Sequence, residues 1–318
     1  MSESVLTGAR YGKDLIRIFR VVRDGEFHQV VEYNATVLLE GDIETSYTIG
    51  DNSVIVATDS IKNITYYLAK ISPHILSPER FALHVGTYIV SKYAHIHRAF
   101  VTLEKLRWSR IPLSANDHPH PHSFLRDGND RQTVEVEVDA SAGKDKLSAK
   151  VTSGLTDLLV LKSTGSAFYG YIQDEYTTLV EVDDRVLSTS VDLAYTFAPL
   201  SLSSPTDDDK LDFTVPEDFA LGSVWDAANV ATRARDATLD IFALDDSASV
   251  QATLFKMGQR VIAENAGVES VTYNLPNKHY IPVDMKYLGV DNTTPANAEV
   301  FAPVSAPSGL ISATISRK

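Results

Sequence analysis

The stretch that decides the fold is residues 77–103, SPERFALHVGTYIVSKYAHIHRAFVTL. Ser77 can cap a helix, and Pro78 fits the first helical turn because that position needs no backbone N–H. The apolar side chains behind them recur at helical spacing, at Phe81, Val85, Tyr88, Ile89 and Tyr93. Residues 99–103, AFVTL, then have strand character. The stretch therefore predicts a half-buried helix that leads into a strand.

The second half of the chain repeats this order. Residues 250–257, VQATLFKM, lead through Val261 and Ile262 into the strand-like residues 269–273, ESVTY. A second helix is expected upstream in the first half, because the apolar residues 53–57 run into Thr58, Asp59 and Ser60, and Ser and Asp favour helix starts.

Strand-like segments surround both helical regions. In the first half, residues 15–22 are followed by a turn at Asp24 and Gly25 and by a second run through residues 37–39, and residues 133–138 close the half. In the second half the corresponding segments are residues 158–161 and 194–197. We infer a tandem strand-strand-helix-helix-strand-strand unit and an α+β fold with antiparallel sheets.

Two polar segments interrupt this pattern. Residues 141–146, SAGKDK, mark a boundary and divide the chain into units 1–143 and 144–318. Residues 201–210, with Pro205 and three successive aspartates, are interpreted as a solvated insertion. Neither segment has a catalytic pattern.

Composition excludes several functions. The 318 residues carry a formal net charge of -13, which would repel a phosphate backbone, so a nucleic-acid partner is not expected. The chain has no cysteine, which excludes disulfides, thiolate nucleophiles and thiolate metal ligands. No apolar run approaches the roughly 20 residues that span a bilayer, and the amino terminus lacks a basic segment followed by an apolar one. We therefore expect neither a membrane protein nor a protein secreted by that route.

A histidine-rich segment is the strongest metal-like signal. Asp117, His118, His120 and His122 lie in the run DHPHPH, residues 117–122. Copper or zinc binding is one interpretation, because alternate imidazoles can face one way in an extended chain. The prolines enforce an extended loop, however, and no carboxylate stands at a recognised ligand spacing. We favour an ordered Pro/His-rich turn without metal.

The common catalytic motifs are absent. The sequence has no Gly-x-Ser-x-Gly elbow and no Gly-x-Gly-x-x-Gly turn, and residues 163–166, STGS, lack the lysine of a phosphate-binding loop. Several separate polar residues could instead bind a planar anionic heterocycle. Arg185 offers a rigid fork, Gln251 pairs a donor with an acceptor, and Phe168 could stack on the ligand.

Seven segments spread over the chain resemble signatures of the urate oxidase (uricase) family. They are residues 11–13, YGK; 51–63, DNSVIVATDSIKN; 120–124, HPHSF; 161–166, LKSTGS; 184–189, DRVLST; 249–253, SVQAT; and 275–280, LPNKHY. The match follows the family's order over nearly the whole chain and is closer to fungal members than to bacterial ones. The insertion at 201–210 and the residues 140–143 are less typical.

The resemblance implies the tunnelling fold (T-fold). In that family each chain carries two such units with helices on the outer face of the sheets, and sheets of two chains close into a barrel. Two barrels stack as a homotetramer, and each substrate pocket lies between subunits. Pairing of this kind would remove exposed strand edges, and we expect it to bury the alternating apolar faces of the strands as well.

The resemblance also implies a set of substrate contacts. Arg185 and Gln251 would clamp urate, Phe168 would stack on it, and Leu179 and Val250 would border the pocket. From a neighbouring chain, Lys13, Thr58 and Asp59 would complete the site. Asn277 and His279 would act above the ring, where oxygen and then water must sit.

The implied reaction needs no cofactor. Deprotonated urate is itself a reductant, so it can pass electrons to O2 without a flavin or a metal, and the expected products are 5-hydroxyisourate and hydrogen peroxide. Lys13 in its neutral form could accept the proton through Thr58, with His279 tuning the relay. Arg185 would favour the urate anion, and Asn277 would orient the attacking peroxide or water.

Two alternatives remain open. A zinc-dependent pterin cyclohydrolase-like protein would need cysteine ligands, which the chain lacks. A purine-binding relative without catalysis would need Arg185 and Gln251 but not the combination of Lys13, Thr58 and His279. The resemblance further implies a peroxisome in a eukaryote, although the chain ends in Ser316-Arg317-Lys318 and not in the usual Ser-Lys-Leu signal, so a cytoplasmic location is the alternative.

Overall fold

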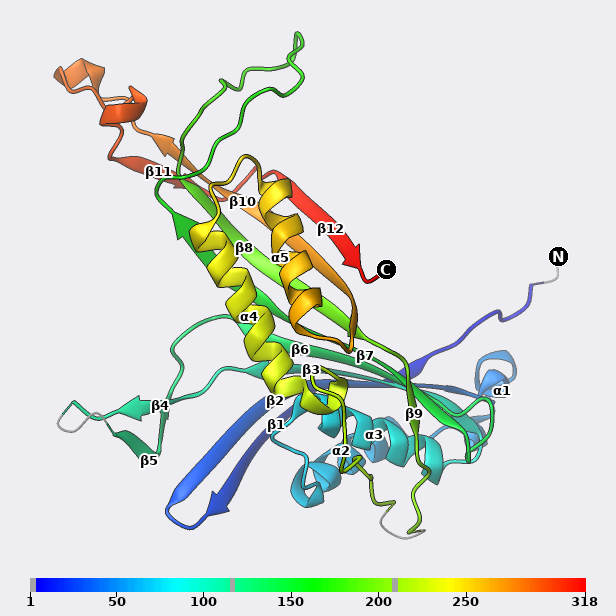
Figure 1. Ribbon diagram of the computed structural model, residues 1–318. Helices are drawn as coiled ribbons and strands as arrows, with labels where there is room; N and C mark the ends of the chain where they lie inside the picture. Colours follow the sequence, from blue (N-terminus) through cyan, green and yellow to red (C-terminus); the bar gives the residue numbers. More distant parts are fainter. Residues whose placement is uncertain (1–3, 115–117, 208–210) are drawn as a thin grey trace.

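The computed structural model describes residues 4–114, 118–207 and 211–318. The fold is α+β, as expected, and every ladder between its named strands is antiparallel. The main sheet follows the order β1-β2-β3-β6-β7-β8-β10-β11, with β12 beside β10 and β9 beside β7 (Figure 1). Within one chain this sheet is open, because β1 forms one edge and β11 and β12 form the other.

The first half contains the predicted helices between the predicted strands. Its elements are β1 (Tyr11–Asp24), β2 (Phe27–Gly41), α1 (Glu44–Thr48), η1 (Asn52–Val54), α2 (Thr58–Ile71), α3 (Pro78–Lys92), β3 (Ile96–Leu106), β4 (Ser109–Pro112), β5 (Pro119–Leu125) and β6 (Arg131–Asp139). α2 begins at Thr58, and α3 begins at Pro78, directly after Ser77. Both helix starts agree with the sequence-based prediction.

The second half follows a similar order. Its elements are β7 (Leu147–Lys162), β8 (Leu187–Phe197), β9 (Leu200–Leu202), η2 (Val224–Asp226), α4 (Ala227–Leu244), α5 (Val250–Glu264), β10 (Val268–Pro282), η3 (Lys286–Leu288), η4 (Pro295–Asn297), β11 (Phe301–Val304) and β12 (Leu310–Ser316). Two strands, two helices and further strands thus occur in the same order in each half. β6 pairs directly with β7, so both halves share one sheet.

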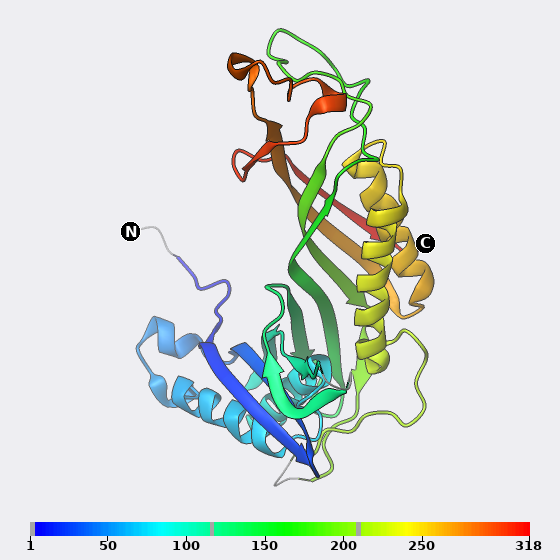
Figure 2. The ribbon, with the colours of Figure 1, turned by 90° about the vertical axis from the view of Figure 1, so that its left-hand side faces the viewer.

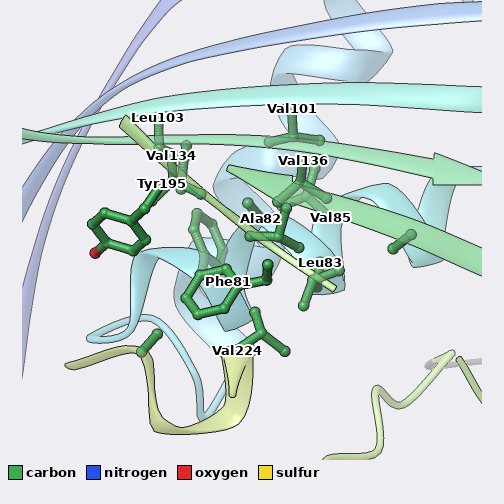
Figure 3. Packing of buried hydrophobic residues seen from close by; sticks show 14 of the residues in the cluster. Phe81, Ala82, Leu83, Val85, Val101, Leu103, Val134, Val136, Tyr195 and Val224 are labelled. Atoms are coloured by element: carbon green, nitrogen blue, oxygen red, sulfur yellow. The ribbon is translucent and has the colours of Figure 1, made fainter. Parts of the chain in front are cut away.

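The helices cover one face of the sheet and form the core with it. Figure 3 shows Phe81 and Val85 of α3 among Val101, Val134 and Val136 of β3 and β6. The side chains of these five residues are at most 2% exposed, which accounts for the stability of this contact. Figure 2 shows the sheet strongly curved, with α4 and α5 along its outer side.

The opposite face of the sheet carries polar pairs, although it also exposes apolar side chains such as Phe19, Leu159 and Leu161. Thr152 and Thr196 join β7 to β8 through their hydroxyls at 3.0 Å, and Thr272 and Thr314 join β10 to β12 at 2.8 Å. The apolar residues of the same strands already lie beneath the chain's own helices. These apolar strand faces are therefore buried by the chain's own helices and not by another sheet, which corrects the expectation drawn from the sequence pattern.

The histidine-rich segment is a strand and not a turn. His120 and His122 lie in β5, which pairs with β4 as a separate hairpin between β3 and β6. Arg110 of β4 stabilises the hairpin by donating to the backbone carbonyl oxygens of Pro121 and His28. Asp117 lies outside the described residues. The prediction of an ordered turn was thus wrong in its secondary structure, because cross-strand pairing could not be read from local spacing.

The segment 201–210 is only in part an insertion on the surface. Its first residues belong to β9, which pairs with β7, and Leu202 is buried. Asp208, Asp209 and Lys210 lie outside the described residues. Among the described helices, none has the length and apolar character needed to cross a membrane.

Candidate active site

Phe168, Arg185 and Gln251 come together at one end of the second half. Lys162 at the end of β7 pairs with Leu187 at the start of β8, so the loop between them begins and ends at the same place. Phe168 and Arg185 lie in this loop, which stands at the top of Figure 1. The start of α5 joins them, because Ser247 forms backbone hydrogen bonds with Gly165 (3.0 Å) and Ala167 (2.8 Å).

Arg185 has the properties of an anion-binding residue. Its guanidinium carbon lies 5.1 Å from the centre of the Phe168 ring. Burial lowers the pKa of Arg185 from its usual value, but an arginine keeps its charge at neutral pH. Its Nε is buried and has no hydrogen-bond partner among the described residues. A buried N–H group without an acceptor is costly, so the half-buried guanidinium is suited to a planar anionic ligand.

Phe168 provides an aromatic face beside this arginine. Its ring stacks on Tyr171 with centroids 4.8 Å apart and an interplanar angle of 16°. Phe168 and Val182 exchange backbone hydrogen bonds of 2.8 and 3.1 Å, which fix the base of the loop. Leu179, farther along the same loop, is 55% exposed. The loop thus leaves its apolar and aromatic side chains at least partly exposed.

The start of α5 carries the next two predicted residues. Ser249 caps the helix by accepting a hydrogen bond from the Ala252 N–H at 3.1 Å. Val250 is buried behind the helix start, and Gln251 is exposed. The exposed amide of Gln251 can therefore present a donor and an acceptor to a ligand.

Asn277 and His279 lie on β10. Asn277 pairs in register with Thr189 of β8, and its N–H donates to the Gly309 carbonyl at 2.8 Å. Its side-chain Oδ1 is buried and accepts no hydrogen bond within the described part of the chain. His279 lies opposite Val304 of β11. Asn277 thus adds a second unpaired polar atom to the site.

Lys13, Thr58 and Asp59 form a separate group in the first half. Thr58 is exposed at the start of α2, and Asp59 accepts hydrogen bonds from Lys62 (2.5 Å) and Asn63 (2.9 Å). The bond from Lys62 is the largest cause of a lowered Asp59 pKa, and the charge of Lys13 lowers it further. Lys13 therefore lies close enough to Asp59 for their charges to interact.

The chain does not bring these two groups together. β1, which carries Lys13, is separated from β10, which carries Asn277, by β2, β3, β6, β7 and β8. At about 4.8 Å between neighbouring strands, the distance along the sheet is about 29 Å. A side chain cannot bridge that distance, so a single chain holds two incomplete halves of the predicted site.

Two other features could be taken for a site but do not contain the predicted substrate residues. A cleft of about 560 Å³ lies between residues 161–165 and 242–246 and does not include Arg185 or Phe168. On the β5 hairpin, the rings of His120 and His122 are 4.5 Å apart, and His28 is 5.9 Å from His122. Within the described residues no group of three or more His, Asp or Glu side chains is placed to hold a metal ion.

The fold and the candidate site together define a class of protein. The chain is an antiparallel α+β protein with a desolvated arginine, an aromatic face and an exposed glutamine, which suit a planar anionic ligand. The Uricase family profile matches residues 9–137 and 151–312. The chain belongs to the uricase family.

Individual relatives agree with this assignment. The uricase of Aspergillus flavus is 44% identical over 317 residues, which cover 99% of this chain and 97% of that protein. The rabbit (Oryctolagus cuniculus) uricase is 33% identical over 99% of this chain and 95% of that protein. The crystal structure of the uricase from Arthrobacter globiformis superposes with a TM-score of 0.83 at 31% identity and covers 100% of this chain and 96% of that one.

Sequence reasoning missed three contributors to the site. Tyr171 stacks on Phe168, Gly309 accepts the Asn277 backbone hydrogen bond, and Asp184 accepts hydrogen bonds from the turn at residues 164–166. Asp184 stands inside the quoted segment 184–189 and immediately precedes Arg185. The position of Asp184 next to Arg185 was a signal in the sequence. The hydrogen-bond partners of Asp184, however, lie about twenty residues upstream, and spacing along the sequence could not identify them.

Proposed function

We propose that this chain oxidises urate with O2 and water to 5-hydroxyisourate and hydrogen peroxide, without a cofactor. The observation that carries the proposal is the Arg185 guanidinium over the Phe168 ring with its Nε unpaired within the described residues. An electron-rich, anionic, planar substrate fits a site of this kind, because the ring can stack while the fork binds its oxygen and nitrogen edge. Membership of the uricase family supports urate as that substrate.

The proposed roles follow from the chemistry of each side chain. Arg185 favours the urate anion by charge, Gln251 pairs with the amide edge of the ring, and Val250 and Leu179 border the pocket. Asn277, whose Oδ1 is buried without a partner in the described chain, orients the oxygen species above the ring, with His279 beside it. Holding the reactants in this arrangement lowers the barrier by proximity and by fixed charge.

We propose that a second chain supplies the proton acceptor. Lys13 and Thr58 remove the urate proton, and Asp59 completes the pocket from that chain. The separation of β1 from β10 by five strands supports this division, since one chain cannot bring the two groups together. The open sheet edges at β1 and β12 support barrel closure by association, in the T-fold homotetramer that the family resemblance implies.

Turnover after chelation tests the reaction. Protein that has been treated exhaustively with a chelator should still consume urate, which is followed by the loss of urate absorbance. It should release one hydrogen peroxide per urate consumed. Metal content should be measured on the same sample. Bound copper or zinc at one per chain whose removal abolishes turnover would contradict the cofactor-free mechanism, and tight urate binding without peroxide would indicate a binding protein instead.

Location in the cell is a separate proposal. A peroxide-producing enzyme of this family belongs in a peroxisome if the source is eukaryotic, because catalase chemistry there disposes of the product. The native protein should then coincide with a peroxisomal marker in the microscope. A diffuse cytoplasmic signal would reject the assignment.

A further inference from the structure

Asp184 holds together the backbone around the substrate residues. Its Oδ1 accepts hydrogen bonds from the Gly165 N–H at 2.8 Å and the Ser166 N–H at 3.3 Å, and its Oδ2 accepts one from the Thr164 hydroxyl at 2.5 Å. The bond from Thr164 is the largest cause of a lowered Asp184 pKa. The exposed carboxylate is therefore ionised at neutral pH, and both of its oxygens accept hydrogen bonds from this turn.

The turn at residues 164–166 requires an acceptor at this point. Gly165 has a φ of +75°, a left-handed conformation that a residue with a side chain rarely adopts. In such a turn successive N–H groups converge and form a small concave donor site that favours an anion. Asp184 fills that site with a charge-assisted set of hydrogen bonds, so a neutral side chain would fill it less well.

The same turn connects the segments that carry the substrate residues. Gly165 and Ala167 pair with Ser247, which lies just before the start of α5 and Gln251. Phe168 lies two residues after the turn, and Arg185 follows Asp184. Asp184 thus joins the Arg185 backbone to the segment of Phe168, and through Ser247 to the helix start that carries Gln251.

Arg185 depends on this backbone for its position. Its Nε has no partner among the described residues, and no ion pair within the described chain involves its guanidinium. Contact with the Phe168 ring at 5.1 Å is what locates the side chain. That contact depends on the separation of the two backbones, which the Phe168–Val182 backbone hydrogen bonds fix at one point and the Asp184 carboxylate fixes next to Arg185.

We propose that Asp184 is a positioning residue for substrate binding, which fixes Arg185 over Phe168 without touching the substrate. The inference rests on the proposed function and deepens it. Loss of the carboxylate should weaken urate binding through Arg185, since displacement of a binding group by about 1 Å can cost up to about a hundredfold in rate or affinity.

The test uses Asp184→Asn in the full-length protein. Urate affinity is measured by calorimetry in the absence of O2, together with KM, kcat and the urea midpoint of unfolding. We expect about a tenfold weaker urate affinity and a higher KM, with an unfolding midpoint close to that of the wild type. Thr164→Val, which removes one of the three hydrogen bonds, should weaken urate binding by a smaller factor and carries the test if Asp184→Asn folds poorly.

A matched control separates positioning from a general loop effect. Asp291 accepts hydrogen bonds from the Thr293 and Thr294 N–H groups and from the Asn297 side chain, but no proposed substrate residue adjoins it. Asp291→Asn removes a similar set of charge-assisted hydrogen bonds in another loop. We expect it to leave urate affinity unchanged.

A double-mutant cycle with Arg185→Gln decides the mechanism. If Asp184 acts through Arg185, Asp184→Asn should change urate affinity by less than about twofold in the Arg185→Gln background. Equal weakening in both backgrounds, or wild-type affinity in Asp184→Asn, would overturn the inference. A wild-type protein that neither binds nor oxidises urate would refute the proposed function instead, so the two failures are distinguishable.

Discussion

Glu79 carries a carboxyl group that is buried in the core. The side chain is 1% exposed and accepts hydrogen bonds from Ser153 (2.9 Å) and Gln132 (3.1 Å). Burial raises its pKa above the usual 4.5, although these bonds and the charge of Lys105 act in the opposite direction. Burial also lowers the pKa of Lys105, so both groups are shifted toward their neutral forms.

This burial predicts a specific pH dependence. Between pH 4.5 and the raised pKa, the folded chain keeps a proton on Glu79 that the unfolded chain has lost. The folded state then binds more protons, so the unfolding free energy contributed by this site falls as the pH rises through that interval. Glu79→Gln lacks the ionisation but keeps an oxygen acceptor. The unfolding free energy of this variant, relative to that of the wild type, should rise by on the order of 1 kcal/mol between pH 4.5 and pH 8, as measured by urea unfolding.

The control for this prediction is Glu135→Gln. Glu135 lies on β6 and is exposed on the polar face of the sheet, so its replacement should give a nearly constant difference from the wild type over the same pH range. If Glu79→Gln also gives a constant difference, the buried carboxyl does not titrate as argued.

At the scale of elements, α3 packs on β6 through a glycine. A Cβ added at Gly86 would lie 2.6 Å from Cγ2 of Val138, which is fully buried and cannot turn away. The helix therefore approaches the strand more closely than any side chain would allow. This close approach seats the apolar face of α3 seen in Figure 3.

Gly86→Ala should destabilise the protein. Overpacking costs about 1 to 3 kcal/mol, while the better helix propensity of alanine returns at most about 1 kcal/mol. We expect a net loss of about 1 kcal/mol or more in urea unfolding. Val138→Ala in the same chain should recover part of that loss by making room. If the double variant loses as much unfolding free energy as the two single variants together, the contact does not limit packing.

At the scale of the whole molecule, the proposed site needs two chains. Lys13 and Thr58 lie on β1 and α2, whereas Arg185 lies in the loop before β8, on the other side of β2, β3, β6 and β7. The face of the sheet opposite the helices combines polar pairs with exposed apolar side chains such as Leu159 and Leu161. Partner contacts are also expected at the sheet edges and at exposed apolar loops such as the one that carries Tyr176 and Leu179.

Mixing inactive variants tests this arrangement. Thr58→Ala and Arg185→Ala should each be inactive alone. After dissociation and joint reassembly, some interfaces would combine both lesions in one site and leave another site intact, so partial activity should return. Verified subunit exchange without any activity, or turnover by an isolated monomer, would show that the site is not shared.

The sequence alone determined the local structure. Pro78 starts α3 and Thr58 starts α2 where predicted, although the Ser77 hydroxyl makes no capping hydrogen bond. Apolar spacing identified the helices and strands, because periodicity acts over a few neighbouring residues. Side-chain chemistry and the family resemblance also predicted Arg185, Phe168 and Gln251 as substrate residues, and this role stays a prediction. The structure brings the loops that carry these three side chains together at the ends of β7 and β8 and the start of α5.

Only the tertiary structure decided what depends on pairing between distant segments. It placed His120 and His122 in a strand, covered the apolar strand faces with the chain's own helices, and gave Asp184 its three donors from residues 164–166. It also separated Lys13 from Arg185 across the sheet. Strand order and cross-strand register follow from the packing of the entire sheet against its helices, and spacing along the sequence carries no information on which distant residues that packing brings into contact.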